Sequence, residues 1–186
     1  MILFRCFPWD AAVRARTRGG ALWFPRMLQG DGRHDNPDLY GCLYVSEEPV
    51  ATVVEQLARF VGTSLAEADF VRPAGRLALA AIELAGEGDV VDLDEPRVLV
   101  REGLRPSQVA THGRSLTQGH AADLFERHAR AAGIRWWSTF ESLWANMTLF
   151  DRAGDDLRLE DVHGLGPGDD VVREAADFLG LRLDLT

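Results

Sequence analysis

The sequence contains no lysine, and all twenty of its basic residues are arginine. A P-loop lysine, a Schiff-base lysine and a Ser–Lys dyad are therefore excluded, and any anion site must use arginine or backbone N–H groups. Cysteine is also scarce. Cys6 and Cys42 have the spacing of neither a metal site nor a redox pair. Two cysteines in a chain of this length are typical of a reducing compartment.

Long hydrophobic runs are missing too. No stretch approaches the ~20 apolar residues of a membrane span. The apolar N-terminus breaks at Pro8 and has neither a basic region nor a cleavage site, so we do not interpret it as a signal peptide. We therefore expect a cytoplasmic protein. Its net charge of −9 argues against general nucleic-acid binding and favours a partner that offers basic residues.

The five histidines do not form a metal-binding pattern. His120 and His128 are eight residues apart and do not share one helical face as an i, i+4 pair would. The chain also contains no His-Glu-x-x-His sequence and no Cys/His cluster. We expect no metal cofactor. His120 follows a predicted helix start and is a candidate contact for an anion at that terminus.

The length of 186 residues suits one domain, so we expect a single domain over residues 1–186. Apolar periodicity predicts four helices, at 47–61, 95–102, 118–132 and 170–179. Ser46 and Thr117 are expected N-caps, and Gly103, Gly133 and Gly180 expected C-terminal stops. Alternating or apolar runs predict strands at 1–7, 39–45, 76–84, 90–93, 134–137, 143–150 and the C-terminal tail. Residues 8–38 and 104–116 are expected to be irregular. Because strands and helices lack a strict βαβ rhythm, the predicted fold is α+β with a mixed β-sheet flanked by helices.

One ordered set of motifs spans residues 30 to 150. A loop with Arg33, His34 and Pro37 leads into a strand ending near Tyr44 and then into a helix with Glu55. Much later, Thr117-Gln118-Gly119 precedes the run Gly133-Ile134-Arg135-Trp136-Trp137-Ser138, and Asn146 and Leu149-Phe150 follow it. This order and spacing resemble the RES-domain family, which is named for its Arg, Glu and Ser.

The resemblance implies a fold similar to that of ADP-ribosyltransferase toxins and an activity on NAD. Members of the family are mostly toxins of toxin–antitoxin pairs, so the resemblance also implies a cognate antitoxin and a possible homo-oligomer. Carried over by position, it makes Arg33, Glu55 and Ser138 catalytic. It makes Arg33, Tyr44 and Ser138 residues that bind NAD. His34, which the family pattern does not specify, is a further candidate because it lies beside Arg33 and can contact a phosphate.

The chemistry of NAD is consistent with these residue types. The planar guanidinium of an arginine, such as Arg33, can bind the pyrophosphate through two parallel hydrogen bonds. Breaking the nicotinamide–ribose bond develops positive charge on the ribose, which the carboxylate of Glu55 can stabilise. Tyr44 can stack on the ribose or hydrogen-bond to it, and Ser138 can hold a phosphate or ribose oxygen. Since nicotinamide leaves from a cationic ring, no strong general acid is required.

Several alternatives stay open at this point. Many family members have Gly-Arg-Trp-Asn or Arg-Phe-Asp around the arginine, where this chain has Arg33-His34-Asp35, so Arg26 is the alternative arginine. Without the family pattern, Glu55 is a solvated helix residue and Tyr44 a strand core residue. The acceptor of the ADP-ribosyl group is water in a glycohydrolase, phosphate in a phosphorylase and a protein in an ADP-ribosyltransferase. A non-catalytic NAD-binding or partner-binding module is the third interpretation.

Overall fold

The computed structural model describes residues 1–85 and 89–184. Its contacts divide the chain into two compact units. The first unit consists of Met1–Trp23, Ser46–Glu83 and Arg158–Thr186, and the second of Phe24–Val45 and Leu84–Leu157. The expectation of one domain over the whole chain stays a prediction.

The first unit is built on β-strands and two main helices. Its strands are β1 (Ile2–Trp9), β3 (Ser64–Leu65), β4 (Val71–Arg72), β5 (Gly75–Leu84), most of β9 (Leu157–Gly164) and β10 (Arg182–Leu183). Its helices are α1 (Pro49–Leu57), α5 (Asp170–Leu179) and the short 3-10 helices η2 (Ala58–Phe60) and η3 (Glu67–Phe70). Strand β5 pairs with β1, β4 and β9, and β3 pairs with β10 in parallel.

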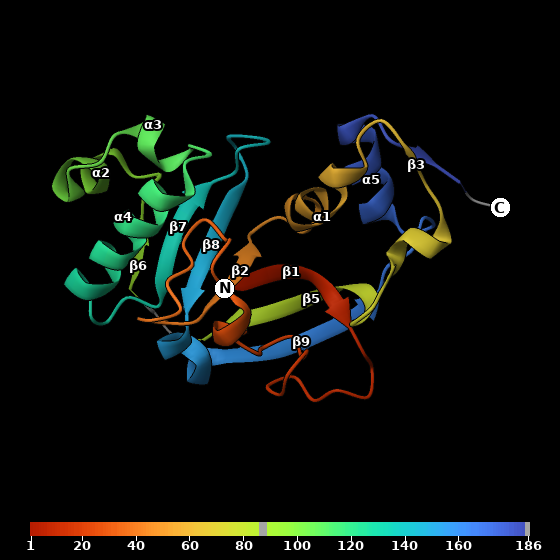
Figure 1. The fold of residues 1–186 in the computed structure, drawn as a ribbon, viewed down its shortest axis with the longest axis horizontal. Helices are drawn as coiled ribbons and strands as arrows, with labels where there is room; N and C mark the ends of the chain where they lie inside the picture. The colour runs from red at the N-terminus through yellow and green to blue at the C-terminus, as the bar shows by residue number, and fades with distance from the viewer. Residues whose placement is uncertain (86–88, 185–186) are drawn as a thin grey trace. The chain divides into compact units, whose positions relative to one another are not determined.

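Helix α1 covers strand β1 and packs against α5 (Figure 1). The apolar stripe of this helix accounts for the packing, since Val50, Val53, Val54 and Leu57 are all buried. A polar contact anchors the same surface, because the hydroxyl of Thr52 accepts the N–H of Cys6 at 2.9 Å. Glu55 lies on the exposed side of α1.

The second unit is a mixed sheet with helices beside it. Its strands run in the order β2 (Cys42–Ser46), β8 (Ala145–Phe150), β7 (Gly133–Trp137) and β6 (Val90–Asp92). Strand β7 is antiparallel to β8 and parallel to β6. Its helices are α2 (Pro96–Glu102), α3 (Pro106–Val109), α4 (Arg114–Arg127) and the 3-10 helices η1 (Arg26–Leu28) and η4 (Asp151–Asp156). Together with the first unit, this confirms the predicted α+β class with mixed strand directions.

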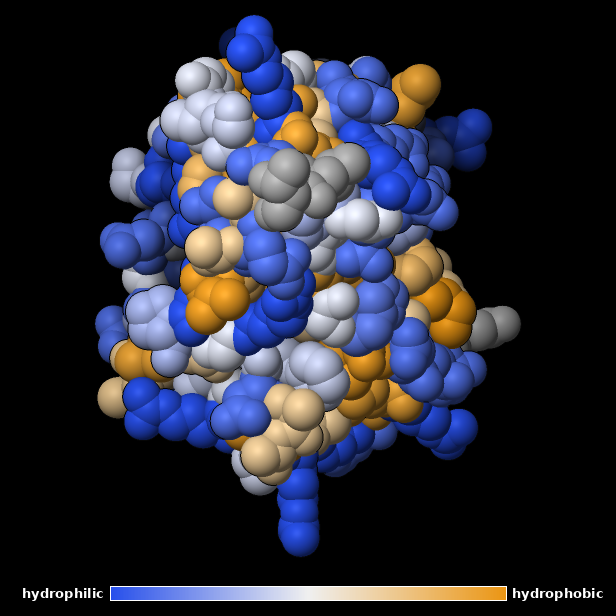
Figure 2. All heavy atoms as spheres, turned by 90° about the vertical axis from the view of Figure 1, so that its right-hand side faces the viewer, coloured by the Kyte–Doolittle hydropathy of each residue, from blue (hydrophilic) through white to orange (hydrophobic). Residues whose placement is uncertain are grey.

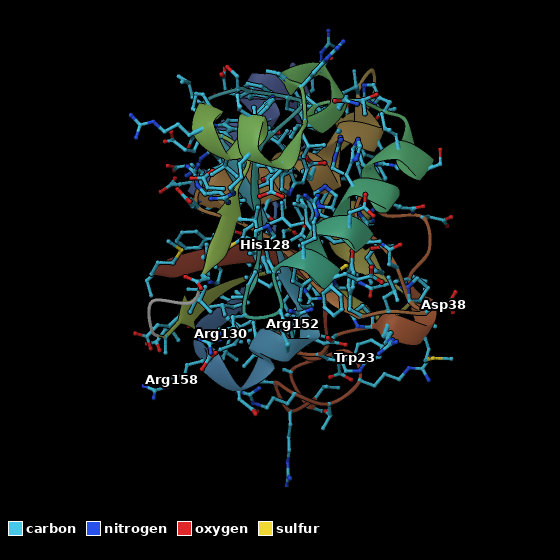
Figure 3. The ribbon with its side chains drawn as sticks, turned by 90° about the vertical axis from the view of Figure 1, so that its left-hand side faces the viewer. Trp23, Asp38, His128, Arg130, Arg152 and Arg158 are labelled. Carbon is cyan, nitrogen blue, oxygen red and sulfur yellow. The ribbon has the colours of Figure 1, made fainter. Side chains whose placement is uncertain are left out.

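Aromatic rings and one arginine organise the core of the second unit. The rings of Tyr40, Phe125 and Phe150 contact one another at centroid distances of 4.5 to 5.0 Å. The guanidinium of Arg152 lies 3.5 Å from the centroid of Phe125. It also donates to the carbonyls of Phe125 and His128 at the end of α4, both at 3.1 Å (Figure 3). Arg152 thereby ties the end of α4 to the sheet.

Several predicted helix boundaries are wrong. Thr117 is not an N-cap, because α4 begins three residues earlier at Arg114 and Thr117 lies inside it. Ser46 ends β2, and Glu48 precedes α1 instead. The segment 104–116 contains α3 and the start of α4, and strand β9 was not predicted.

Two of the three predicted C-terminal glycine signals are confirmed. Gly133 is not a helix stop, because α4 ends at Arg127 and Gly133 begins β7. Gly103 and Gly180 adopt left-handed backbone angles, with φ of 69° and 66°, directly after α2 and α5. Of the predicted tail strand, β10 covers two residues, and Leu185 lies outside the described residues.

Within the described ranges, we find no helix long and apolar enough to cross a membrane. Figure 2 shows a surface on which hydrophilic residues predominate and hydrophobic ones form small groups. In the first unit, the large hydrophobic side chains that remain exposed include Val61, Val71 and Phe178, at 59%, 59% and 44%. Hydrophobic residues that are scattered singly are normal on a protein surface.

Candidate functional site

Four of the five predicted site residues belong to the second unit, and three of them meet around one segment. This segment, residues 29–40, is called the Arg33 loop below. Arg33 and His34 lie on it, and Tyr44 reaches it from β2. Ser138 follows the end of β7. Glu55 belongs to the first unit, on α1.

The carboxylate of Asp35 holds the Arg33 loop together. One of its oxygens accepts the N–H groups of Gly30 and Gly32 at 2.9 and 2.7 Å. The other accepts the hydroxyl of Tyr44 at 2.6 Å and the thiol of Cys42 at 3.3 Å. Burial raises the pKa of Asp35, but the hydrogen bonds from Tyr44, Gly30 and Gly32 outweigh burial and leave that pKa lowered. Asp35 is therefore an ionised anchor.

Gly32 is required for this close approach. A Cβ atom at Gly32 would lie 2.5 Å from both the Asp35 carboxylate and the Tyr44 hydroxyl. Contacts that short do not occur in folded proteins, so any larger residue would push the carboxylate off its donors. The glycine before Arg33 thus serves packing inside the loop.

The hydroxyl of Tyr44 is already engaged within the protein. It donates to Asp35 and accepts the backbone N–H of His34 at 2.9 Å. Burial is the main cause of the raised pKa of this phenol, which stays protonated. Tyr44 therefore fixes the backbone next to Arg33, and its one proton is committed to Asp35.

Arg33 is buried, with 6% of its surface exposed. Its Nη1 donates to the carbonyls of Val109 and Thr111 at 2.9 and 2.6 Å, and its guanidinium lies 4.6 Å from the ring centroid of Trp136. Its own carbonyl accepts the hydroxyl of Thr117 on α4 at 2.6 Å. These contacts hold a positive charge in a fixed place between the sheet and the helices of the second unit.

His34 forms a buried network with two other residues. Its Nδ1 lies 2.8 Å from the hydroxyl of Thr148, which also accepts the indole N–H of Trp136 at 3.2 Å. The His34 and Trp136 rings meet edge to face at 5.4 Å. Burial lowers the pKa of His34 to about 3, and the charge of Arg33 adds to this effect. His34 is therefore neutral at physiological pH.

Ser138 is 3% exposed and lies two residues beyond Trp136, in line with the alternation of β7. Its N–H donates to the carbonyl of Trp144 at 2.8 Å, and its hydroxyl oxygen accepts the N–H of Phe140 at 3.1 Å. Among the described residues, no acceptor takes the proton of this hydroxyl. Ser138 can therefore still donate a hydrogen bond to a ligand.

Arg26, the alternative arginine, has a different environment. Its side chain donates to the carbonyls of Pro37 and Asp38 at 2.5 and 2.9 Å and lies 3.7 Å from the carboxylate of Asp151. It therefore supports the outer end of the Arg33 loop. Arg33 is the arginine that contacts Trp136, two residues before Ser138.

Sequence reasoning missed the polar residues that clamp the loop. Asn36 donates to the carbonyls of His34 and Gln118 at 3.3 and 3.0 Å, and Gln118 donates to those of Gly30 and Gly32 at 2.9 and 2.8 Å. Asp35-Asn36 before Pro37 is a turn signal that favours side-chain bonds to nearby backbone. That signal indicates a turn, but it does not indicate that Asn36 and Gln118, which are far apart in the sequence, bond across the loop.

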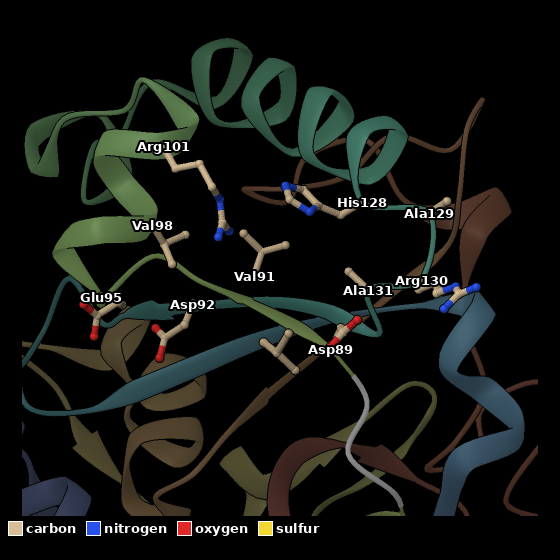
Figure 4. Close-up of a pocket in the computed structure, with 11 residues that line it drawn as sticks. Asp89, Val91, Asp92, Glu95, Val98, Arg101, His128, Ala129, Arg130 and Ala131 are labelled. Atoms are coloured by element: carbon tan, nitrogen blue, oxygen red, sulfur yellow. The ribbon is translucent and has the colours of Figure 1, made fainter.

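A separate cavity of about 640 Å³ lies elsewhere in the second unit, between β6, α2 and the end of α4 (Figure 4). Arg101, His128 and Arg130 line it together with the acidic residues Asp89, Asp92 and Glu95. Asp92 also bonds to Arg135, and His128 bonds to the buried Glu102 at 3.0 Å. None of the predicted site residues lines this cavity. In the described part of the chain, no group of three or more His, Cys, Asp or Glu residues is placed to hold a metal ion.

The RES domain family model matches residues 4–172, and this chain belongs to that family. Among solved structures, the fold is similar to one described as the crystal structure of the M. tuberculosis MbcT–MbcA toxin–antitoxin complex. The TM-score is 0.59 at 17% identity, over 97% of this chain and 88% of the other. A search of curated proteins finds no match.

Proposed function

We propose that this protein consumes NAD by cleaving the bond between nicotinamide and ribose, and that it acts as the toxin of a toxin–antitoxin pair. The observation that carries the proposal is membership of the RES family over residues 4–172. Arg33, Tyr44, Glu55 and Ser138 stand in the order and spacing of the family motif. The fold shared with a chain of the M. tuberculosis toxin–antitoxin complex supports the toxin role.

In this proposal, the second unit binds the dinucleotide. Arg33 supplies a buried positive charge for the pyrophosphate, which a chain without lysine has to meet with arginine or backbone donors. Ser138 donates its hydroxyl proton to a phosphate or ribose oxygen. Tyr44 and Asp35 act by positioning, since their mutual hydrogen bond fixes the backbone beside Arg33.

Glu55 is the proposed electrostatic catalyst. When the nicotinamide leaves, positive charge grows on the ribose, and a nearby carboxylate stabilises that charge. Nicotinamide leaves as a neutral molecule, so this step needs no proton from the protein. An exposed position on α1 is compatible with a group that meets substrate from solvent.

Release of nicotinamide from NAD by the purified protein tests the proposal. Parallel reactions with and without phosphate separate the acceptors, because water yields ADP-ribose and phosphate yields a phosphorylated ADP-ribose. A labelled protein band in a lysate given labelled NAD would instead identify a protein ADP-ribosyltransferase. No nicotinamide release under any condition, together with no binding of NAD, would rule out the proposal.

The proposed partner is an antitoxin encoded beside this chain. Its test is co-expression: the chain alone should lower cellular NAD and arrest growth, and co-expression of the neighbouring gene should restore both. A cell in which the active chain alone leaves NAD unchanged contradicts the toxin role.

A further inference from the structure

One buried polar atom near the Arg33 loop has no partner. The Nε2 atom of His120 has less than 1 Å² of accessible surface, and no hydrogen-bond partner for it is found among the described residues. Buried polar atoms are nearly always paired, because an unpaired one loses its bonds to water without replacement. An atom of this kind needs an explanation.

Helix α4 explains why this atom is buried, although the His120 side chain as a whole is only partly buried. His120 lies three residues after Thr117, and Thr117, Ala121 and Leu124 form the buried face of this helix. Thr117 bonds to the carbonyl of Arg33 from that same face. His120 is thus carried by the element that clamps the loop.

The charged groups that act on His34, with His120 among them, favour an anion. The charges of Arg33, Arg114 and His120 all act on the buried His34, and each opposes its protonation. The one neighbouring carboxylate that acts the other way is Asp35, and its two oxygens are occupied by four donors. An oxyanion therefore finds donors and positive charge here, and the only carboxylate acting on His34 is already fully hydrogen-bonded.

We propose that the Nε2 of His120 donates a hydrogen bond to a phosphate oxygen of the dinucleotide, beside Arg33. This inference rests on the proposed function, because it names a further binding residue of the same site. It assigns His120 to the pyrophosphate and not to the reacting nicotinamide–ribose bond. His120 is therefore a binding residue that the family motif does not include, although its place near a helix start made it a candidate anion contact.

The test compares His120→Leu, His120→Gln and the control His112→Leu, which changes an exposed histidine just before α4. Calorimetry would measure binding of ADP-ribose and of nicotinamide riboside, which lacks phosphate. We expect His120→Leu to bind ADP-ribose at least about tenfold more weakly, because a hydrogen bond to a charged group is lost. Binding of nicotinamide riboside should not change. His120→Gln, which keeps an N–H donor, should recover most of the affinity.

Thermal unfolding supplies a second readout that a structural histidine would not give. Removing an unpaired buried polar atom should leave the Tm of His120→Leu unchanged or higher. The inference is overturned if ADP-ribose affinity is unchanged, if both ligands lose affinity equally, or if the Tm falls by several degrees. Wild-type protein that binds ADP-ribose through His120 but releases no nicotinamide would refute the proposed function alone. Release of nicotinamide without ADP-ribose binding would refute this inference alone.

Discussion

Asp35 stands at the centre of the Arg33 loop, although the family motif is named for other residues. Its two oxygens accept from two backbone N–H groups, a phenol and a thiol. The loop has no regular secondary structure of its own, so these bonds replace the ladder that a helix or strand would provide. The conformation of Arg33 therefore depends on a neighbouring carboxylate.

Replacing Asp35 by Asn should destabilise the protein. The new amide presents two N–H donors where the loop supplies only donors, and at least one buried donor stays unpaired. We expect the free energy of unfolding to fall by about 1–3 kcal/mol. Urea denaturation measures this change, with Asp38→Asn as the control, because Asp38 is exposed. Equal stability of the two variants would contradict the role of Asp35 as an anchor.

His34 should make stability depend on pH. Its pKa is near 6.5 in the unfolded chain and about 3 in the folded protein, where burial and the charges of Arg33, Arg114 and His120 outweigh the opposing charge of Asp35. Between these values the unfolded state binds a proton that the folded state excludes. The contribution of His34 to stability is therefore complete above pH 6.5 and is lost as the pH falls toward 3.

The expected slope is about 1.4 kcal/mol per pH unit within this window. Urea denaturation of wild type and His34→Asn at pH 7, 6 and 5 isolates it, since Asn can still bond to Thr148 and does not titrate. The lowered pKa of Asp35 causes a further loss of stability only below about pH 4, because the pKa of an aspartate in the unfolded chain lies there. If both proteins lose stability in parallel between pH 7 and pH 5, the histidine is not buried as described.

At the scale of elements, helix α4 and the loop that it clamps each contain a glycine, and the two glycines differ in the space around them. Gly119 is exposed within the helix, and a Cβ there meets nothing within 4 Å. Gly32 in the loop clamped by this helix has no such space. The same substitution should therefore have opposite effects at the two positions.

We expect Gly119→Ala to stabilise the protein by about 0.5–1 kcal/mol, since alanine loses less backbone entropy in a helix. Gly32→Ala should destabilise it by about 1–3 kcal/mol, through its clash with Asp35 and Tyr44. The two melting temperatures measure this contrast directly. A Gly32→Ala variant as stable as wild type would mean that the loop is looser than the structure describes.

The elements that the sequence predicted well have local signals. The stripe of Val50, Val53, Val54 and Leu57 marks α1, and Gly103 and Gly180 mark the ends of their helices. The predicted start of α4 was wrong because Thr117 has the chemistry of an N-cap but lies inside the helix. Its hydroxyl donates to the carbonyl of Arg114 in the same helix and to that of Arg33 in the distant loop. A distant partner of this kind leaves no trace in local propensity.

The family pattern named candidate site residues but not the network around them. It selected Arg33, Tyr44 and Ser138, which belong to the second unit, and Glu55, which belongs to the first. It gave Asp35, Asn36 and Gln118 no role in the site, although Gln118 lies in the Thr117-Gln118-Gly119 motif, because the bonds of these residues join positions up to 88 apart. Such pairings are set by the tertiary fold, which a single sequence does not reveal.

For the whole molecule, the proposed function gives the catalytic carboxylate to Glu55, which lies on α1 of the first unit. The second unit supplies fixed positive charge and donors for an anionic ligand. In the proposed function, Glu55 supplies the negative charge that the reacting ribose requires. The proposed activity therefore depends on a residue whose own surroundings in the sequence look like an ordinary solvated helix face.

Nicotinamide release from NAD by wild type, Glu55→Gln and the matched control Glu48→Gln tests this account most directly. Glu48 is exposed and immediately precedes α1, so the control makes the same chemical change next to the same helix. The account predicts release by wild type and by Glu48→Gln, and a rate lower by about a hundredfold or more for Glu55→Gln, with equal melting temperatures. Release by Glu55→Gln at the wild-type rate, or no release by wild type with and without phosphate, would contradict it.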